Sequence, residues 1–329
     1  MKRDRFVFFL PNEDYYKIPY YGLENEKNVE IIDALIDSNN KLKRSAYLFC
    51  SSTKVNRIMK IPGKKLWFPS FCRIQATDDR MFFVFFDAQL RKYTKDYRIF
   101  LKKRYKNCRI ILFLTDLVAS FRKIDLDEIR FFADLILTYE LRDAKKYEFQ
   151  YYPDVYSKLP STCLKSEYPD ISLLFCGYKK NREDMIRHMV DFLERETICS
   201  EFIVPDLDIQ PQRAWVRLWS NRIPYIEYLK KLQKTNCILE LEQEGATGYT
   251  LRTLEALCYG RKLITNNKEI KNAPFYNERF IKVIDRAEDL DVEWIKSKEE
   301  VSLGDIGEFT PGRLIAFIQE YFDKRDRGL

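Results

Sequence analysis

Short, almost entirely apolar runs separated by helix-length segments constrain the fold of this chain more than any other feature of its sequence. Residues 81–86 read Met-Phe-Phe-Val-Phe-Phe, and residues 109–114 read Arg-Ile-Ile-Leu-Phe-Leu. Runs of this length without polar alternation are typical of strands that are covered on both faces of a parallel sheet. Because such runs alternate here with helical patterns, the sequence predicts an α/β fold with mainly parallel sheets.

The pattern occurs in two sets, one in each half of the chain. In the first half we expect strands at residues 6–10, 47–51, 81–86, 109–114 and 135–139, with helices at 28–37, 88–105 and 126–133. A segment with three prolines and no clear period, residues 151–169, marks the domain boundary. In the second half we expect strands at 171–176, 201–204, 237–241, 262–265 and 280–284, with helices at 181–196, 224–234, 251–258 and 311–322.

Composition narrows the class of partner. The chain has 57 basic and 50 acidic residues, a net charge of +7, which favours anionic partners such as phosphates or an anionic membrane surface. Its basic residues are scattered and no recognition motif is present, so we expect no nucleic-acid partner. The eight cysteines form no C-x-x-C pair, and the single histidine, His188, is expected at the surface, so we expect no metal site. With no signal peptide and no long apolar stretch, the sequence predicts a cytoplasmic protein.

The segment 240–267 concentrates the features of a binding site. It predicts a strand, a loop with Gly245 and Gly248, a helix that Thr250 caps, and Gly260 at the helix end. Small loop residues, free amides at a helix start and the nearby Arg252 suit a phosphate or diphosphate. A carboxylate one turn further along the helix is a natural partner for a ribose or sugar diol. The alternative is an ordinary strand–turn–helix connection with a capped helix.

This segment resembles the donor-site region of the bacterial GT-B-type glycosyltransferases that build lipopolysaccharide and capsular polysaccharide. Residues 247–255, Thr-Gly-Tyr-Thr-Leu-Arg-Thr-Leu-Glu, and residues 260–267, Gly-Arg-Lys-Leu-Ile-Thr-Asn-Asn, match the family pattern closely. Residues 170–184 are similar to the first strand of the family's nucleotide domain, and residues 143–156 to its interdomain crossing. The resemblance covers about residues 135–285, while the amino-terminal half matches in its alternating layout alone.

The resemblance implies two Rossmann-like domains that face each other across a cleft. Residues 1–160 would form the acceptor domain and 161–310 the donor domain, while 311–329 would form a helix that packs back toward the first domain. The implied activity is transfer of a hexosyl group from a nucleotide-sugar to a cell-surface glycan or lipid-linked acceptor. The protein would lie in the cytoplasm, with peripheral contact at the anionic inner face of the membrane. The alternative is a non-catalytic protein that binds a nucleotide or a sugar phosphate.

The donor site implied in this way draws on two loops. After the strand at 171–176, the cations of a glycine turn would neutralise a diphosphate leaving group, unless they form a solvated basic turn. Such cations and helix amides can replace a divalent metal, so we expect turnover without a metal and no cofactor besides the nucleotide-sugar substrate. Ten residues lie between Glu244 and Glu255, whereas seven separate the paired glutamates of many GT-B enzymes. The resemblance therefore implies Glu255 as the ribose candidate and no role for Glu244. The candidate donor residues are Gly177, Lys179, Arg182, Gly248, Tyr249, Thr250, Arg252 and Glu255.

Two aspartates are candidates for the base that deprotonates an acceptor hydroxyl. Asp87 and Asp116 each end an apolar run, where parallel sheets usually present ligand-facing loops. We rank Asp116 first, because the strand before it is the longer run and is expected to be more central. The alternative is that both aspartates cap the segments that follow them. The tyrosine-rich loop at 12–21 would either stack on sugar rings or cover the core.

Overall fold

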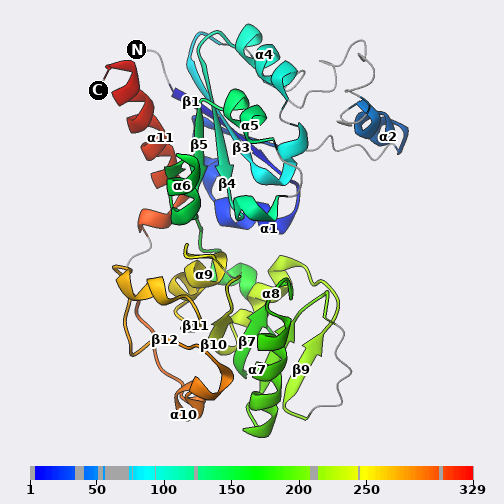
Figure 1. Cartoon of the computed structure of the whole chain (residues 1–329), viewed down its shortest axis with the longest axis vertical. Coiled ribbons are helices and arrows are strands. Elements are labelled where there is room, and N and C mark those ends of the chain that lie inside the picture. Colours follow the sequence, from blue (N-terminus) through cyan, green and yellow to red (C-terminus); the bar gives the residue numbers. More distant parts are fainter. Residues whose placement is uncertain are drawn as a thin grey trace. The chain divides into compact units, whose positions relative to one another are not determined.

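The computed structural model describes residues 4–33, 41–50, 55, 74–75, 77–92, 94–121, 125–207, 214–243, 245–303 and 307–328. The chain divides into two compact units, Met1–Pro153 and Asp154–Leu329. Each unit contains a six-stranded sheet in which every strand pair is parallel (Figure 1). The predicted α/β architecture is therefore confirmed. The roles of the two units and the packing of 311–329 stay predictions.

The sheet of the first unit has the strand order β2-β1-β3-β4-β5-β6. Its central strands β3 and β4 run side by side, with Phe83 opposite Ile110. Alternate residues of these strands pack into a buried core together with α4 (Lys95–Arg104) and α5 (Leu126–Phe132). The strands are β1 (Asp4–Leu10), β2 (Val29–Asp33), β3 (Arg80–Phe86), β4 (Cys108–Leu114), β5 (Leu135–Thr138) and β6 (Gln150–Tyr151); the further helices are α1 (Asp14–Lys17), α2 (Lys41–Cys50) and α6 (Leu141–Tyr147).

Two predictions for the first unit are wrong. The helix expected at 28–37 is replaced over Val29–Asp33 by strand β2, which pairs with β1 so that Ile31 lies opposite Phe8. The apolar spacing there fits a helix as well as a strand, and the sheet partner decides. The strand expected at 47–51 is instead the end of helix α2 through Cys50, because residues 41–50 continue one helical run. Residues 34–37 and 51 lie outside the described part of the chain.

The sheet of the second unit has the strand order β12-β11-β10-β7-β8-β9. Helices α7 and α10 share a core with alternate residues of β7 and β10, while α8 and α9 also contact β10 (Figure 1). The sequence did not predict β9 or α10, which are short. The strands are β7 (Ile171–Cys176), β8 (Ser200–Ile203), β9 (Val216–Trp219), β10 (Thr235–Glu240), β11 (Lys262–Thr265) and β12 (Ile281–Val283); the helices are α7 (Glu183–Arg195), α8 (Tyr225–Leu232), α9 (Leu251–Tyr259), α10 (Val292–Lys296) and α11 (Pro311–Asp326).

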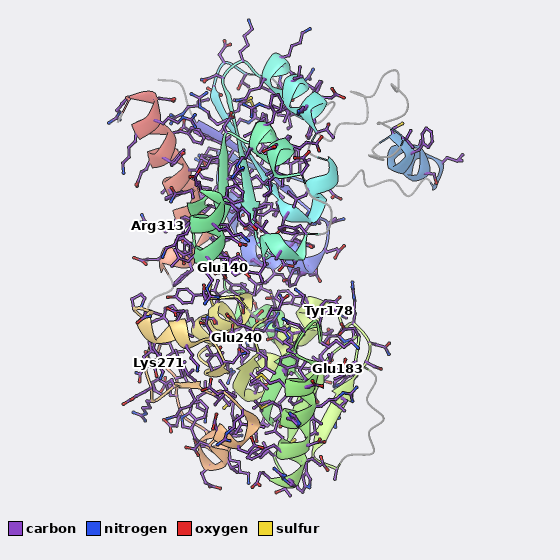
Figure 2. The ribbon with its side chains drawn as sticks, viewed as in Figure 1. Glu140, Tyr178, Glu183, Glu240, Lys271 and Arg313 are labelled. Atoms are coloured by element: carbon purple, nitrogen blue, oxygen red, sulfur yellow. The ribbon has the colours of Figure 1, made fainter. Side chains whose placement is uncertain are left out.

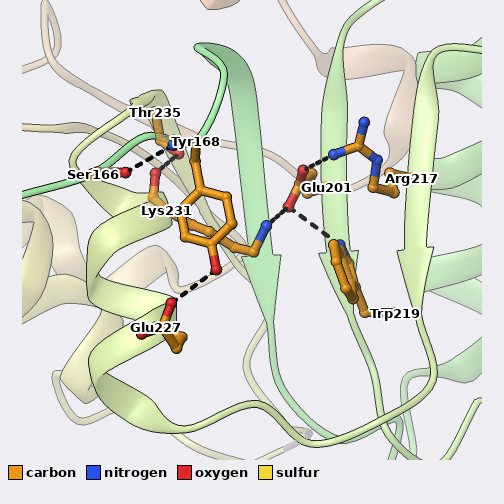
Figure 3. Close-up of polar contacts among 8 residues, drawn as sticks. All are labelled: Ser166, Tyr168, Glu201, Arg217, Trp219, Glu227, Lys231 and Thr235. Atoms are coloured by element: carbon orange, nitrogen blue, oxygen red, sulfur yellow. Dashed lines mark hydrogen bonds and ion pairs between the residues drawn. The ribbon is translucent and has the colours of Figure 1, made fainter.

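A buried ion pair between Lys231 and Glu201 links α8 to strand β8 of the second sheet (Figure 3). Lys231 of α8 is 2% exposed, and its Nζ donates to Oε2 of Glu201 on β8 over 2.7 Å. The same ammonium lies 4.0 Å from the ring centre of Tyr168 and 4.5 Å from that of Trp219. Glu201 also accepts from Arg217 (2.8 Å) and Trp219 (3.2 Å). These partners compensate both buried charges and hold α8 in one position.

No helix among the described residues is long and apolar enough to cross a membrane.

Candidate functional site

The carboxyl edge of the second sheet brings together two loops that lie far apart in sequence. Strand β7 ends at Cys176 and the neighbouring strand β10 ends at Glu240, so the loops after both strands start at the same edge. Figure 2 labels Tyr178 in the first of these loops and Glu240 at the end of β10. The residues that the sequence predicted for donor binding come from these two loops and from helix α9.

The second loop, which follows β10, leads directly into helix α9. Thr250 caps the helix as predicted, with its Oγ1 accepting from the amide of Arg252 over 3.1 Å. Gly260 ends the helix in the left-handed conformation at a φ of 59°, also as predicted. The loop before the helix needs glycine at Gly245, where φ is 88°. Asn267 holds this loop, since its Nδ2 donates to the carbonyl of Gly248 over 3.3 Å.

Glu240 is a residue of this site that the sequence analysis did not single out. Its side chain is buried, and its carboxylate accepts from the hydroxyl groups of Thr250, Thr253 (2.9 Å) and Thr265 (2.7 Å). These three hydroxyls come from the cap of α9, its first turn and strand β11. Glu240 therefore sets the position of the α9 start relative to the sheet. A glutamate at the end of an apolar strand carries no local signal for such a role.

Arg252 and Glu255 form an ion pair on the first turns of α9. Nη1 of Arg252 donates to Oε2 of Glu255 over 2.7 Å, and the guanidinium lies 4.2 Å from the ring centre of Tyr228. Burial acts against the charged form of Arg252, but the Glu255 carboxylate holds the pKa of the guanidinium well above its usual range. Glu255 is completely buried, and it also accepts from the hydroxyls of Tyr225 and Tyr228. Its predicted ribose contact is not part of these bonds and stays a prediction.

Arg182 lies on the other loop of the same edge. Its guanidinium donates to the backbone carbonyls of Tyr178 (2.9 Å from Nη2) and Leu241, which ties the two loops together. Gly177 makes this possible, because a β-carbon there would lie 2.7 Å from Nη2 of Arg182. Lys179 is partly exposed, and its Nζ pairs with Glu183 at 2.8 Å.

Tyr249, also predicted for the donor site, packs edge-to-face with Phe275, the ring centres 5.0 Å apart. Its aromatic ring therefore supports the loop before α9, and burial raises the pKa of its hydroxyl.

The charges of Arg182 and Arg252 both affect the thiol of Cys176, and the charge of Arg252 also affects Arg182. Burial raises the pKa of Cys176 to about 11, and both Arg252 and Arg182 oppose that rise. Burial lowers the pKa of Arg182; the carboxylate of Glu240 opposes this effect, while the charge of Arg252 adds to it. Two like charges held near a helix start favour an anion with more than one charged group. The arrangement suits a diphosphate.

The carboxyl edge of the first sheet carries the two predicted base candidates. Asp87 accepts from the amide (2.7 Å) and the hydroxyl (3.0 Å) of Thr115, whereas Oδ1 of Asp116 accepts from the amide of Leu117 (2.8 Å). Burial raises the pKa of Asp87 to about 6, and the neighbouring charge of Asp116 adds to the rise. The reason for ranking Asp116 first does not hold, because β3 and β4 are both seven residues long and both central.

The tyrosine-rich loop at 12–21 contains both buried and exposed rings, and its predicted stacking on sugar rings stays a prediction. Tyr20 is buried, and its ring centre lies 5.1 Å from that of Phe86, so it covers the core. Tyr15 and Tyr21 are 46% and 41% exposed.

His188 is exposed on α7, as expected. Within the described part of the chain, no group of three or more His, Cys, Asp or Glu side chains is placed to hold a metal ion. Glu244 lies outside that part.

The comparisons with known proteins identify the architecture. No protein-family model and no curated protein matches the sequence. Among solved structures, the chain is similar to an alpha-glucosyltransferase in complex with UDP and a 13-mer DNA, with 13% identity, 90% of each chain covered and a TM-score of 0.56. It is also similar to a protein from Listeria monocytogenes assigned as a UDP-N-acetylglucosamine 2-epimerase, with 11% identity, 98% of each chain covered and a TM-score of 0.50. At these identities the likeness shows the fold, and the fold is of the GT-B type with two parallel α/β units.

Proposed function

We propose that this protein is a glycosyltransferase that moves a hexosyl group from a nucleotide-sugar donor to a cell-surface glycan or lipid-linked acceptor. The observation that carries the proposal is that Arg182, which donates to the carbonyl of Leu241 just after β10, and Arg252, in the first turn of α9, lie at one carboxyl edge of a parallel sheet. The resemblance of residues 247–255 and 260–267 to polysaccharide-building enzymes supports the class of acceptor.

In this proposal the second unit binds the nucleotide diphosphate of the donor. Arg252, Arg182 and the amides that follow Thr250 neutralise the phosphates, and Gly248 lets the backbone approach them. When the glycosidic bond breaks, negative charge accumulates on the leaving diphosphate. Cations that are already fixed in place stabilise this charge without reorganisation. Turnover therefore does not require a divalent metal.

The base for the acceptor hydroxyl is Asp87 in this proposal, with Asp116 beside it. A general base works best when its pKa lies near the working pH, and the raised pKa of about 6 brings Asp87 closer to that range. Asp116 contributes charge that helps to raise this pKa. The amide and hydroxyl of Thr115 keep the Asp87 carboxylate in a defined orientation.

We further propose that the first unit contacts an anionic membrane through α4 and α5. Helix α4 has the sequence KDYRIFLKKR, which contains five basic residues and one acidic residue. Ile99 on α4 and Phe131 on α5 are 57% and 44% exposed, and the ammonium of Lys95 lies 5.4 Å from the ring centre of Phe131. Exposed apolar side chains flanked by cations favour the interface of an anionic bilayer.

The donor assignment is tested by calorimetric titration of the whole protein with UDP, GDP, CDP and ADP. We expect one of these to bind, and Arg182→Ala to weaken it about ten-fold or more, as for the loss of a charge-assisted contact. The matched control is Arg286→Ala, which removes an exposed guanidinium that pairs with Asp289 in the same unit. Binding that is equal in all three proteins, or absent from the wild type, would contradict the assignment.

Turnover distinguishes the enzyme from a binding protein. The wild type is incubated with the corresponding nucleotide-sugars, alone and with oligosaccharide, lipid-linked or DNA acceptors. Release of nucleoside diphosphate with transfer to a glycan or lipid-linked acceptor supports the proposal. Transfer to DNA would contradict the proposed acceptor, and binding without any turnover would favour the non-catalytic alternative.

A further inference from the structure

Glu255 lies in a buried network of hydrogen bonds that involves both of its carboxylate oxygens. Its side chain has no exposed surface. Oε1 accepts from the hydroxyl of Tyr225, while Oε2 accepts from the hydroxyl of Tyr228 and from Nη1 of Arg252, both over 2.7 Å. Because Glu255 is buried, a ribose hydroxyl could reach it only if one of these donors moved aside, and a displaced tyrosine hydroxyl would lose its acceptor. Such a loss costs about 1–3 kcal/mol per buried group.

The network continues to Tyr156, near the beginning of the second unit. The hydroxyl of Tyr225 also lies 3.1 Å from that of Tyr156, which is fully buried. Tyr156 is held in turn by its amide, which donates to the carbonyl of Phe309 over 2.8 Å. The tyrosine hydroxyls around Glu255 therefore belong to buried side chains of the second unit.

Arg252 is the most exposed member of the network. Its side chain is 14% exposed, and its guanidinium is fixed on one side by Glu255 and on one face by the ring of Tyr228. Arginine has five N–H donors, so a guanidinium that gives one of them to Glu255 keeps others for an anion. A flexible arginine would lose side-chain entropy on binding, and a preorganised one loses less.

We propose that Glu255 is a positioning residue, which with Tyr228 fixes the guanidinium of Arg252 for the donor diphosphate and does not itself bind the ribose. This inference rests on the proposed function and specifies how its donor site works. The two possible roles of Glu255 affect different parts of the nucleotide. A ribose ligand would contact the 2′- and 3′-hydroxyls, whereas a residue that fixes Arg252 affects binding of the phosphates.

The experiment compares three probes: the nucleoside diphosphate that binds tightest among UDP, GDP, CDP and ADP, its 2′-deoxy analogue, and inorganic pyrophosphate. Each is titrated into the wild type and into Glu255→Gln. The variant keeps the volume of the side chain but removes the charge. We expect the affinity for all three probes to fall by a similar factor, about ten-fold or more, since each contains the diphosphate. The ratio of ribose to deoxyribose affinity then stays that of the wild type.

Two variants with a smaller change accompany this comparison. Tyr228→Phe removes one hydroxyl from Oε2 of Glu255 and leaves the carboxylate in place, so it should weaken the three probes equally but less. Tyr168→Phe removes a hydroxyl that donates to Glu227 on the same helix α8, and should leave all three affinities unchanged. If Glu255→Gln does not fold, as judged by circular dichroism, the Tyr228→Phe result decides.

The possible results distinguish failure of this inference from failure of the proposed function. A loss confined to the ribonucleotide, with pyrophosphate binding intact, would overturn the inference and restore Glu255 as the ribose ligand. Unchanged affinities would overturn it as well. Failure of the wild type to bind any nucleoside diphosphate would instead contradict the proposed function itself.

Discussion

The guanidinium of Arg182 occupies the space in which Gly177 would carry a side chain. A β-carbon at Gly177 would lie 2.7 Å from Nη2 of Arg182, closer than such atoms approach in proteins. The backbone of Gly177 does not have a positive φ, so an added β-carbon would act on the end of the Arg182 side chain and not on the backbone conformation. The turn after β7 and the arginine five residues later thus form one structural unit.

Gly177→Ala should therefore displace Arg182 and weaken nucleoside diphosphate binding about ten-fold, comparable to loss of the arginine contact. Titration calorimetry measures this effect. The matched control is Gly312→Ala on α11, where an added β-carbon has nothing within 4 Å. The control should bind normally and gain up to about 1 kcal/mol in the free energy of unfolding, because alanine favours the helix. Normal binding by Gly177→Ala would show that the position of Arg182 is not critical.

Asp87 should make both activity and stability depend on pH. If it is the base, kcat/KM should rise as the pH increases through about 6, the raised pKa of this carboxyl. Because this pKa lies above the unfolded value, the folded state holds the proton more tightly. Asp87 therefore lowers stability progressively as the pH rises from about 4 to about 6.

Asp87→Asn cannot ionise, so it should be more stable than the wild type above pH 6, by about 1–3 kcal/mol, while turnover falls about 10²–10⁴-fold. Chemical unfolding at several pH values and steady-state kinetics measure the two effects. Asp116→Asn is the companion variant, and its effect on turnover should be smaller. A large loss in Asp116→Asn with near-normal Asp87→Asn would reverse the assignment.

Lys231→Met should destabilise the protein strongly. The substitution leaves Glu201 buried with fewer donors, and breaking a buried ion pair typically costs about 3–5 kcal/mol. Thermal and urea unfolding measure the change. Lys230→Met on the same helix removes a partly exposed pair with Glu227 and should cost less than about 1 kcal/mol. Similar losses in both variants would mean that burial does not decide the strength of the Lys231 pair.

The membrane proposal predicts a specific loss on α4 and α5. Wild-type protein should float with vesicles that contain anionic lipid, and not with neutral ones, because the contact combines apolar insertion and charge. The double variant Ile99→Ser, Phe131→Ser should lose most of this binding. Leu141→Ser on α6 removes a side chain of similar exposure (43%) and should float like the wild type. Equal flotation of all three proteins would place the contact elsewhere.

Metal independence is tested by removing divalent cations. Turnover should be unchanged by EDTA, because fixed arginines and helix amides supply the positive charge that the leaving diphosphate needs. The measurement is the initial rate with and without chelator, followed by addition of Mg²⁺ or Mn²⁺. Activity that is abolished by EDTA and restored by either ion would refute this prediction.

Several features of the fold and of the site follow from the sequence directly. The apolar runs at 81–86 and 109–114 predict central parallel strands, and β3 and β4 are such strands. Thr250 and Gly260 predict the start and the end of α9. These are properties of neighbouring residues, since caps, glycine stops and buried strands depend on local backbone chemistry.

Other features depend on partners that are distant along the chain. Residues 29–33 fit a helix by their spacing, but they form a strand because β1 offers them an edge. Arg182 bonds Leu241 across 59 positions, and the hydroxyl of Tyr225 reaches Glu255 across 30. The sequence determined by itself that parallel sheets form and that a capped helix follows β10. The tertiary structure decided which charges meet at the sheet edge, because strand order, and not separation along the chain, determines which side chains become neighbours.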